Sequence, residues 1–395
     1  MELLKPKAPP PKKRPSLLVR FLAFLTTLAL VAGAVFLVAH RDVWNLDSLW
    51  RWIRYLGVER SDTGQADSFP YEGGSTNRFA LLDGELLVCS PTTIRLYSGS
   101  GAVSLEKAVS MEQPVVDVNA GSALVYDAGG RELLVVSGAQ EVFSLTLEEE
   151  ESFLSARLSA GGYLAVTAQT SGYKGVVTVY DPSFQAVLRI NLSSRFITDA
   201  AVSPDGSTVA LLSLGLSGSS FDTHLEFYRL SRSEEDVEPD LTCSLGNDVI
   251  LDMDWKSDGI WLVGESALSI YAADGALSGR YDYGGQYLKN YSLDGSGYAV
   301  LLLGKYRAGS GTTLLAVDAA GSAAASLSFD EQVLSLSAAG NYVAVLTAGN
   351  LQIYSQELNL YRTLETTQGA RLVLQRADGS TMLINADTAH LYVPN

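Results

Sequence analysis

The feature that most constrains the fold is a short, strand-like apolar motif that recurs along the chain. It occurs eight times, as Ile94–Tyr97, Leu133–Val136, Val177–Tyr180, Leu225–Tyr228, Leu268–Tyr271, Leu314–Val317, Leu351–Tyr354 and Ala389–Tyr392. The last residues of successive copies lie 39, 44, 48, 43, 46, 37 and 38 residues apart. This period is typical of β-propellers, in which each blade is a four-stranded sheet. The sequence therefore predicts an all-β propeller.

The same motif predicts the number of blades and the way in which the ring closes. Eight copies predict eight blades, and seven blades with one weak unit wrongly divided is the alternative. The last unit, from about Ala370 to Asn395, ends after its third strand. Because an open ring would leave unpaired strand edges, we expect residues 66–74 to supply the missing outer strand. The propeller would then span residues 66–395.

The first 40 residues predict a membrane anchor. Residues 1–16 form a proline-rich leader, and residues 1–40 hold six Lys and Arg but one acidic residue. Phe21–Ala39 is a run of 19 uncharged residues, which as a helix spans about 28 Å, near the hydrocarbon thickness of a bilayer. We expect a single transmembrane helix in residues 17–40, with a cleaved signal peptide or a buried core helix as alternatives. The positive-inside rule places the leader in the cytoplasm and the propeller on the outer side of the cell membrane.

Residues 41–65 connect this anchor to the propeller. Apolar residues recur at helical spacing between Leu46 and Leu56. The aromatic residues of the segment are of types that settle at lipid headgroups, namely Trp44, Trp50, Trp52 and Tyr55. We predict a helix that lies on the membrane surface and contacts lipid through these rings. The alternative is a helix that packs under the following domain.

Several stretches of the chain resemble a known family. They are the basic leader, the apolar run, the tryptophan-rich helix and the sequences SFPYEGG (68–74), LLVCSPTTIRLYSGSG (86–101) and AVSPDGSTVALLSL (201–214). In this order they resemble an uncharacterised family of membrane-anchored β-propeller proteins of Gram-positive bacteria, a domain of unknown function. The resemblance implies a protein of the cell envelope with no assigned activity. More distantly, the blades are similar to WD-repeat and quinoprotein-type propellers, although the WD dipeptide is absent.

Composition narrows the classes of partner and of chemistry. The net charge of -16 argues against nucleic acid as a partner, because binding phosphates needs a basic face. From residue 41 onward, 43 acidic residues face 22 basic ones. Two cysteines are too few for a disulfide scaffold. Nucleophile elbows, zinc-binding H-E-x-x-H motifs and glycine-rich phosphate loops are missing from the sequence, so we do not expect an enzyme.

Polar residues at equivalent places in consecutive blades predict a site at the channel. Asp117, Ser155, Asp199 and Asp252 each follow an apolar-led pair at the start of an innermost strand. The pattern ends in later blades, where Leu288 and Val333 come closest to that place. Asp117, Asp199 and Asp252 would form an acidic rim around one channel mouth and are candidate ligands of a divalent cation, the only cofactor considered. The alternative is that these carboxylates accept hydrogen bonds from loop backbone.

Loop lengths indicate the same face of the propeller. The connections between second and third strands are enlarged at residues 169–175, 214–223 and 304–312. These connections and the starts of the innermost strands open on one face, opposite to the face at which an outer closing strand begins. Binding residues often lie on loops of a rigid scaffold. We therefore predict a binding face, pointing away from the membrane, that includes Tyr173, Lys174, Phe221, Tyr306 and Arg307.

Two classes of function fit these patterns. The favoured one is a membrane-anchored module that binds or scaffolds an envelope protein, peptide or glycan. The alternative is an extracytoplasmic hydrolase or lyase that uses carboxylates, with or without a divalent cation. Paired carboxylates that converge in one pocket with a bindable metal would favour the enzyme, whereas a broad dry patch of aromatic side chains on the loops would favour the module.

Overall fold

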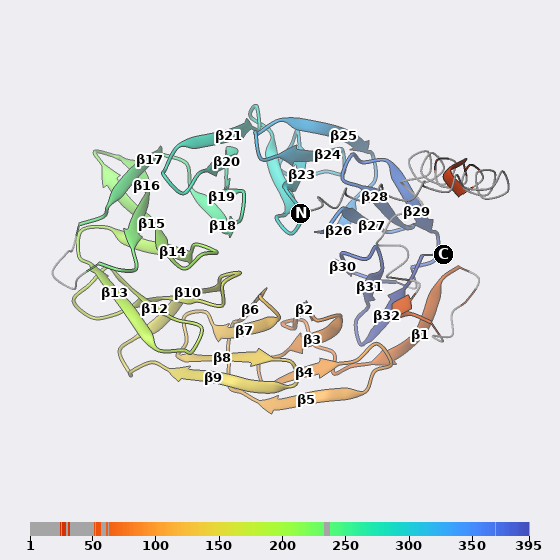
Figure 1. The fold of residues 1–395 in the computed structure, drawn as a ribbon, viewed down its shortest axis with the longest axis horizontal. Coiled ribbons are helices and arrows are strands. Elements are labelled where there is room, and N and C mark those ends of the chain that lie inside the picture. Colours follow the sequence, from red (N-terminus) through yellow and green to blue (C-terminus); the bar gives the residue numbers. More distant parts are fainter. Residues whose placement is uncertain are drawn as a thin grey trace, which may run out of the picture.

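The structure is a computed structural model that describes residues 24, 26–28, 31, 51, 53–56, 61, 63–232, 238–367 and 369–394. These residues contain 32 strands in eight four-stranded sheets. The sheets are arranged as the blades of a ring (Figure 1), and residues of several innermost strands line a cavity in its central channel. The predicted eight-bladed propeller is confirmed, and the seven-bladed alternative is wrong.

The predicted anchor falls largely outside the described residues. This holds for most of residues 17–40 and for Trp44, Trp50 and Trp52. Among the residues that the structure does describe, no helix is long and apolar enough to cross a bilayer. The transmembrane helix therefore stays a prediction from the sequence.

Each of blades 1–4 is an antiparallel meander whose strands run from the channel outward. Blade 1 consists of β2 (Arg78–Leu82), β3 (Glu85–Cys89), β4 (Thr93–Tyr97) and β5 (Val103–Ala108). Blade 2 consists of β6 (Pro114–Asn119), β7 (Ser122–Asp127), β8 (Glu132–Ser137) and β9 (Gln140–Thr146). Blade 3 consists of β10 (Ser152–Leu158), β11 (Leu164–Gln169), β12 (Gly175–Tyr180) and β13 (Ala186–Leu192). Blade 4 consists of β14 (Phe196–Val202), β15 (Thr208–Ser217), β16 (Ser220–Arg229) and β17 (Leu241–Gly246).

Blades 5–7 repeat this order, and blade 8 differs in its outer strand. Blade 5 consists of β18 (Ile250–Lys256), β19 (Gly259–Gly264), β20 (Ala267–Tyr271) and β21 (Leu277–Asp282). Blade 6 consists of β22 (Tyr287–Ser292), β23 (Tyr298–Gly304), β24 (Thr312–Asp318) and β25 (Ala323–Phe329). Blade 7 consists of β26 (Val333–Ala339), β27 (Tyr342–Thr347), β28 (Leu351–Ser355) and β29 (Leu360–Leu364). Blade 8 consists of β30 (Leu372–Gln375), β31 (Thr381–Ile384), β32 (Thr388–Tyr392) and, as its outer strand, β1 (Gln65–Pro70).

The ring closes through β1, as the sequence predicts. β1 runs antiparallel to β32, with Ser68 opposite His390 and Phe69 opposite Ala389. The Phe69 ring also stacks on Tyr97 of blade 1, with ring centroids 5.7 Å apart. Gly101 lies directly against Phe69 with φ of 81°, so a side chain there would be both strained and in collision with the ring. The closing strand therefore seals blade 8 and packs against blade 1.

The core lies between the blades. Eight hydrophobic clusters are found in the described residues, and each joins two adjacent blades. The cluster between blades 4 and 5, for example, contains Leu212 and Phe227 from one blade and Met253 and Trp255 from the next. Because each sheet buries both faces against its neighbours, second and third strands are almost continuously apolar, as in Gly259–Gly264.

The antiparallel register defines two faces of the propeller. At one face, the start of the first strand lies opposite the end of the second, as Ser152 lies opposite Gln169 in blade 3. We call this the loop face, since it carries the connections between second and third strands and between blades. The opposite face carries the turns between first and second strands. β1 starts there, because Gln65 pairs with Tyr392 at the end of β32, and we call it the tether face.

Candidate functional site

The predicted channel residues all lie on innermost strands but do not form an open rim. Asp117 is the fourth residue of β6, Ser155 of β10 and Asp199 of β14, and Asp252 is the third residue of β18. Because two or three strand residues precede each of them, they lie inside the channel and not at its mouth, which corrects the predicted acidic rim. Ser155 and Asp199 are buried, and the Ser155 hydroxyl donates a short hydrogen bond to the Asp199 carboxylate. These two side chains contact one another across a blade boundary.

Arg157, which the sequence analysis overlooked, occupies the centre of this group. Its Nε donates to Asp199 Oδ2 at 2.7 Å, and its Nη2 donates to Asp252 Oδ1 at 2.5 Å. One guanidinium from β10 thus joins the innermost strands of three consecutive blades. Among the described residues, no three acidic, His or Cys side chains form a group that could hold a metal ion. Two of the three predicted cation ligands are instead paired with arginine.

Asp117, the third candidate ligand, bonds to backbone. Its Oδ2 accepts a hydrogen bond of 2.7 Å from the Leu158 amide in the next blade. This is the alternative role considered for these carboxylates. Burial raises the pKa of Asp117 to about 6, although the nearby Arg157 charge and the Leu158 amide act in the opposite direction. Asp117 therefore joins blades 2 and 3 at a desolvation cost.

A β-bulge recurs in the innermost strand of blades 3–7. In blade 3, Phe153 pairs with Ala168 and Ser155 with Thr167, which leaves Leu154 as an extra residue. The extra residues of the five blades are Leu154, Thr198, Leu251, Lys289 and Leu334. A polar residue follows each of them: Ser155, Asp199, Asp252, Asn290 and Ser335. Bulges redirect side chains, and here the extra residues Leu154, Thr198, Leu251 and Leu334 are exposed.

This register corrects the equivalence predicted for the later blades. Asn290 and Ser335 occupy the place of Asp252, whereas Leu288 and Val333 lie two residues earlier. Asp117 is not equivalent to the others, because β6 pairs with β7 without a bulge. The repeated triplet of an apolar residue, an extra residue and a polar residue was the sequence signal that could have shown this.

The channel holds a cavity of about 630 Å³ near the tether face. It is lined by Asp117, Arg157 and Asp252, by the ends of innermost strands, and by turns to the second strands. Charged residues at the ends of the innermost strands also interact in this cavity. Lys256 Nζ donates to the Leu293 and Gly295 carbonyls and lies 3.9 Å from Asp254 Oδ2. Burial raises the pKa of Asp254 and lowers that of Lys256. The cavity thus opens away from the predicted binding loops.

The predicted loop residues are exposed on the loop face. They are Tyr173, Lys174, Phe221, Tyr306 and Arg307. Lys174 Nζ donates to the Ser194 carbonyl at 3.0 Å and lies 5.0 Å from the ring centroid of Phe196. Residues 214–223 are not a loop, however, because β15 and β16 extend as a hairpin in which Leu216 pairs with Phe221. This group lies outside the channel acids and does not meet them in one pocket.

Exposed apolar side chains gather on the loop face. Three come from the bulges at the channel mouth, two from the starts of β14 and β22, and four from hairpins farther out. We call them the apolar ring: Leu154, Tyr173, Phe196, Leu216, Phe221, Leu251, Tyr287, Tyr306 and Leu334, with exposed fractions from 36% to 73%. Exposed apolar side chains on the loops of a rigid scaffold are typical of a binding surface.

Tyr55 does not lie at a lipid surface, which corrects its assignment to the membrane interface. Only 6% of it is exposed, and its hydroxyl lies 3.0 Å from Ser380 Oγ and accepts a hydrogen bond from Arg376. The neighbouring Arg51 donates to the Asp378 carbonyl at 2.7 Å and to the Tyr361 hydroxyl at 2.6 Å. At these residues the segment packs under the propeller, on the tether face of blades 7 and 8.

Comparisons with known proteins identify the fold and the family. The chain is similar to the C-terminal WD40 domain of Sif2, with a TM-score of 0.59 and 11% identity, over 84% of this chain and 99% of that domain. It is also similar to the β-propeller domain of Cps50 (Swd1) from Myceliophteria thermophila, with a TM-score of 0.48 and 11% identity, over 83% of this chain and 98% of that one. No curated protein matches it. At such identity the likeness to Sif2 establishes the propeller fold alone. Residues 61–389 match a family model, and the chain therefore belongs to DUF5711, a family of unknown function.

Proposed function

We propose that this protein is a membrane-anchored, extracytoplasmic module that binds a protein of the cell envelope on its loop face. The observation that carries the proposal is the apolar ring. Bulges recur in five consecutive blades and expose Leu154, Leu251 and Leu334 around one channel mouth. Exposing three leucines to water is unfavourable unless another surface covers them.

The position of the tether supports the same arrangement. β1 starts on the tether face, and Arg51 and Tyr55 are fixed to that face by hydrogen bonds. A chain that enters from the membrane at this face leaves the loop face pointing outward, accessible to a partner. The basic leader and the uncharged run of the sequence support this orientation.

The channel acids support a structural role more than the alternative of a carboxylate-based hydrolase or lyase. Asp199 and Asp252 are paired with Arg157, and Asp117 accepts from backbone of the next blade. These interactions join neighbouring blades. The paired carboxylates therefore lie inside the channel, whereas the apolar ring lies on the exposed loop face, where a large partner can reach it.

Photo-cross-linking in intact cells tests the proposed function. A photoreactive residue is placed at Leu251 or at Leu334, and at Val187 as the control, which is equally exposed but lies on the outer strand of blade 3. We expect both ring positions to give an adduct with one and the same protein and Val187 to give none. Adducts of equal yield from all three positions, or from none, would contradict the proposal.

A second experiment tests the location. Ser171 is exposed in the loop between β11 and β12, and Ser171→Cys supplies a thiol for a membrane-impermeant reagent. We expect labelling in intact cells to equal labelling after lysis. Labelling only after lysis would place the loop face in the cytoplasm.

A further inference from the structure

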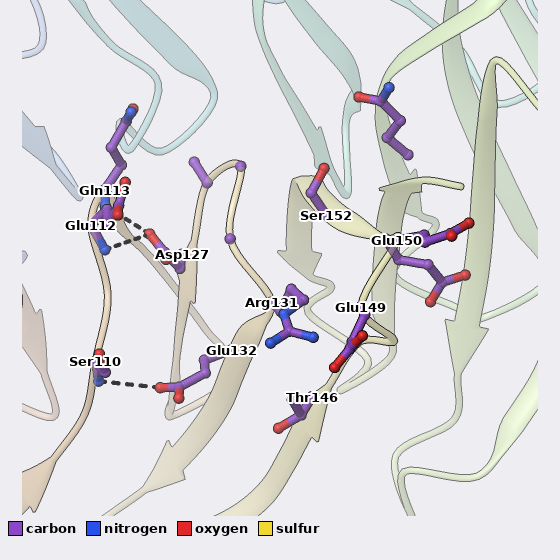
Figure 2. Close-up of a pocket in the computed structure, with 15 residues that line it drawn as sticks. Ser110, Glu112, Gln113, Asp127, Arg131, Glu132, Thr146, Glu149, Glu150 and Ser152 are labelled. Carbon is purple, nitrogen blue, oxygen red and sulfur yellow. Dashed lines mark hydrogen bonds between the residues drawn. The ribbon is translucent and has the colours of Figure 1, made fainter. Parts of the chain in front are cut away.

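The loop face also carries an acidic groove next to the apolar ring. The groove lies between blades 2 and 3 and encloses about 750 Å³. Its charged residues are Glu112, Asp127, Arg131, Glu132, Glu149, Glu150 and Glu151, six carboxylates against one guanidinium. They arise from the connections before β6 and β10 and from the hairpin between β7 and β8, and Figure 2 labels all of them except Glu151.

Three of the carboxylates hold the groove in shape. Asp127 Oδ1 accepts from the Glu112 and Gln113 amides at 2.9 and 2.7 Å, and Glu132 accepts from the Ser110 amide at 3.2 Å (Figure 2). Glu151 accepts from the Thr170 hydroxyl at 3.0 Å. These contacts are local and belong to the fold.

The other acids are placed to meet a ligand. Glu112, Glu149 and Glu150 are exposed, and Glu149 and Glu150 are adjacent on the connection that leads into β10. Among the residues that line the groove, Arg131 is the one cation that offsets their negative potential, so a cation in the groove would be attracted. A carboxylate cluster alone could be a solvated surface, but this one is joined to the apolar ring.

The groove and the apolar ring are separated by only a few residues of chain. Glu151, at the edge of the groove, lies three residues before Leu154 of the ring, which is about 10 Å of extended chain. A bound segment that places an apolar side chain on Leu154 therefore brings residues a few positions away over Glu149 and Glu150.

Basic side chains near the rest of the apolar ring indicate which way a charged partner segment would lie. Lys174 lies at the boundary of blades 3 and 4, and Lys305 and Arg307 lie in the loop of blade 6. A cationic segment would be repelled by these three side chains and attracted by the groove, whose lining carries six carboxylates against one guanidinium. The apolar ring thus has a strongly acidic groove at blades 2 and 3 and basic side chains at Lys174, Lys305 and Arg307.

From this layout we propose that the partner docks through a segment that carries apolar side chains followed by Lys or Arg. The apolar part lies on the ring and the basic part lies in the groove between blades 2 and 3. This inference rests on the proposed function and names the chemistry of its partner.

Peptide binding to the full chain in nanodiscs of neutral phosphatidylcholine tests the inference. The probe is a fluorescent peptide with a leucine- and phenylalanine-rich half and a lysine-rich half, and a second peptide carries glutamates in place of the lysines. Empty nanodiscs give the blank. We expect the lysine peptide to bind and the glutamate peptide not to bind. Equal binding of the two would overturn the inference.

The groove is tested with Glu149→Gln/Glu150→Gln. Because exposed ion pairs are each worth a fraction of a kcal/mol to about one, we expect the dissociation constant to rise about three- to tenfold. Raising the salt concentration should weaken binding to the parent more than to the variant, because exposed charges are screened. The matched control is Asp330→Asn/Glu331→Gln, two adjacent exposed acids in the corresponding connection between blades 6 and 7. An equal loss in this control would overturn the assignment to the groove.

Leu251→Ser/Leu334→Ser separates the two proposals. If these substitutions weaken peptide binding while cross-linking from the ring succeeds, both stand. If cross-linking succeeds but Glu149 and Glu150 have no influence on binding, the partner chemistry is wrong and the proposed function stands. If neither ring substitutions nor ring cross-links have an effect, the proposed function itself is wrong.

Discussion

Replacing Arg157 is the perturbation whose outcome the structure defines most closely. Its guanidinium pairs with Asp199, whose side chain is 10% exposed, and with Asp252, whose side chain is 26% exposed. Arg157→Met keeps much of the side-chain volume and leaves two carboxylates without a cation. Breaking a buried ion pair costs about 3–5 kcal/mol.

The lower end of that range applies, because other donors and solvent remain. Asp199 keeps hydrogen bonds from Ser155 and from the Ala200 amide, and Asp252 keeps one from the Met253 amide. We expect a loss of about 3 kcal/mol at pH 7.5, which for a domain of this size lowers the melting temperature by roughly 4 °C.

Urea unfolding followed by tryptophan fluorescence measures this change, because Trp255 is buried between blades 4 and 5. The control is Arg157→Met/Asp199→Asn/Asp252→Asn, which removes the uncompensated charges along with the cation. We expect the triple variant to recover most of the lost stability. The reasoning would be refuted if Arg157→Met unfolded at the same urea concentration as the parent, or if the triple variant were no more stable than the single one.

Three other predictions follow from contacts described above. Asp117→Asn keeps an acceptor for the Leu158 amide. The pKa of Asp117 in the folded protein is about 6, which is above its value in the unfolded chain. Ionisation of Asp117 therefore destabilises the parent progressively as the pH rises from about 4 to 6. In urea unfolding, Asn should therefore stabilise by about 1–3 kcal/mol above pH 6 and not below pH 4, and a pH-independent difference would contradict this. Arg51→Met should lower stability by about 1 kcal/mol, since the partly buried Tyr361 hydroxyl and the Asp378 carbonyl lose their donor; an unchanged melting curve would mean that the tether is not fixed there. Phe69→Ala should cost about 3–5 kcal/mol in calorimetry by opening the seam between blades 8 and 1, and a smaller loss than for an exposed outer-strand residue would refute the closing role.

Periodic features of the fold could be predicted from the sequence, because each blade repeats the same local pattern. The motif ending at Tyr97, Tyr180 or Tyr271 marks one strand per blade, and its spacing predicts the eight units that the structure contains. The missing outer strand of blade 8 implied a closing strand near residues 66–74, and β1 occupies Gln65–Pro70.

The candidate site could be predicted only in part, because its geometry depends on register. In one blade alone, an extra residue such as Leu251 is recognised only from the pairing partners of Ile250 and Asp252, and only comparison of the triplets of blades 3–7 could have indicated it from the sequence. A shift of one residue changes which side chains face the channel. For this reason the exposed leucines were missed, and the later blades were aligned two residues away from Asn290 and Ser335.

The sequence by itself determined the class of fold, the number of blades, the closing strand and the charge asymmetry from which a membrane anchor is predicted, since all of these are local or periodic. Only the tertiary structure decided what lies together across blades. It placed Arg157 between acids that are 42 and 95 residues away in the chain, and it packed Tyr55 against Ser380 and not against lipid. An amphipathic stripe is equally suited to a membrane or a protein surface, and an ion pair between blades depends on distances that only the closed ring sets.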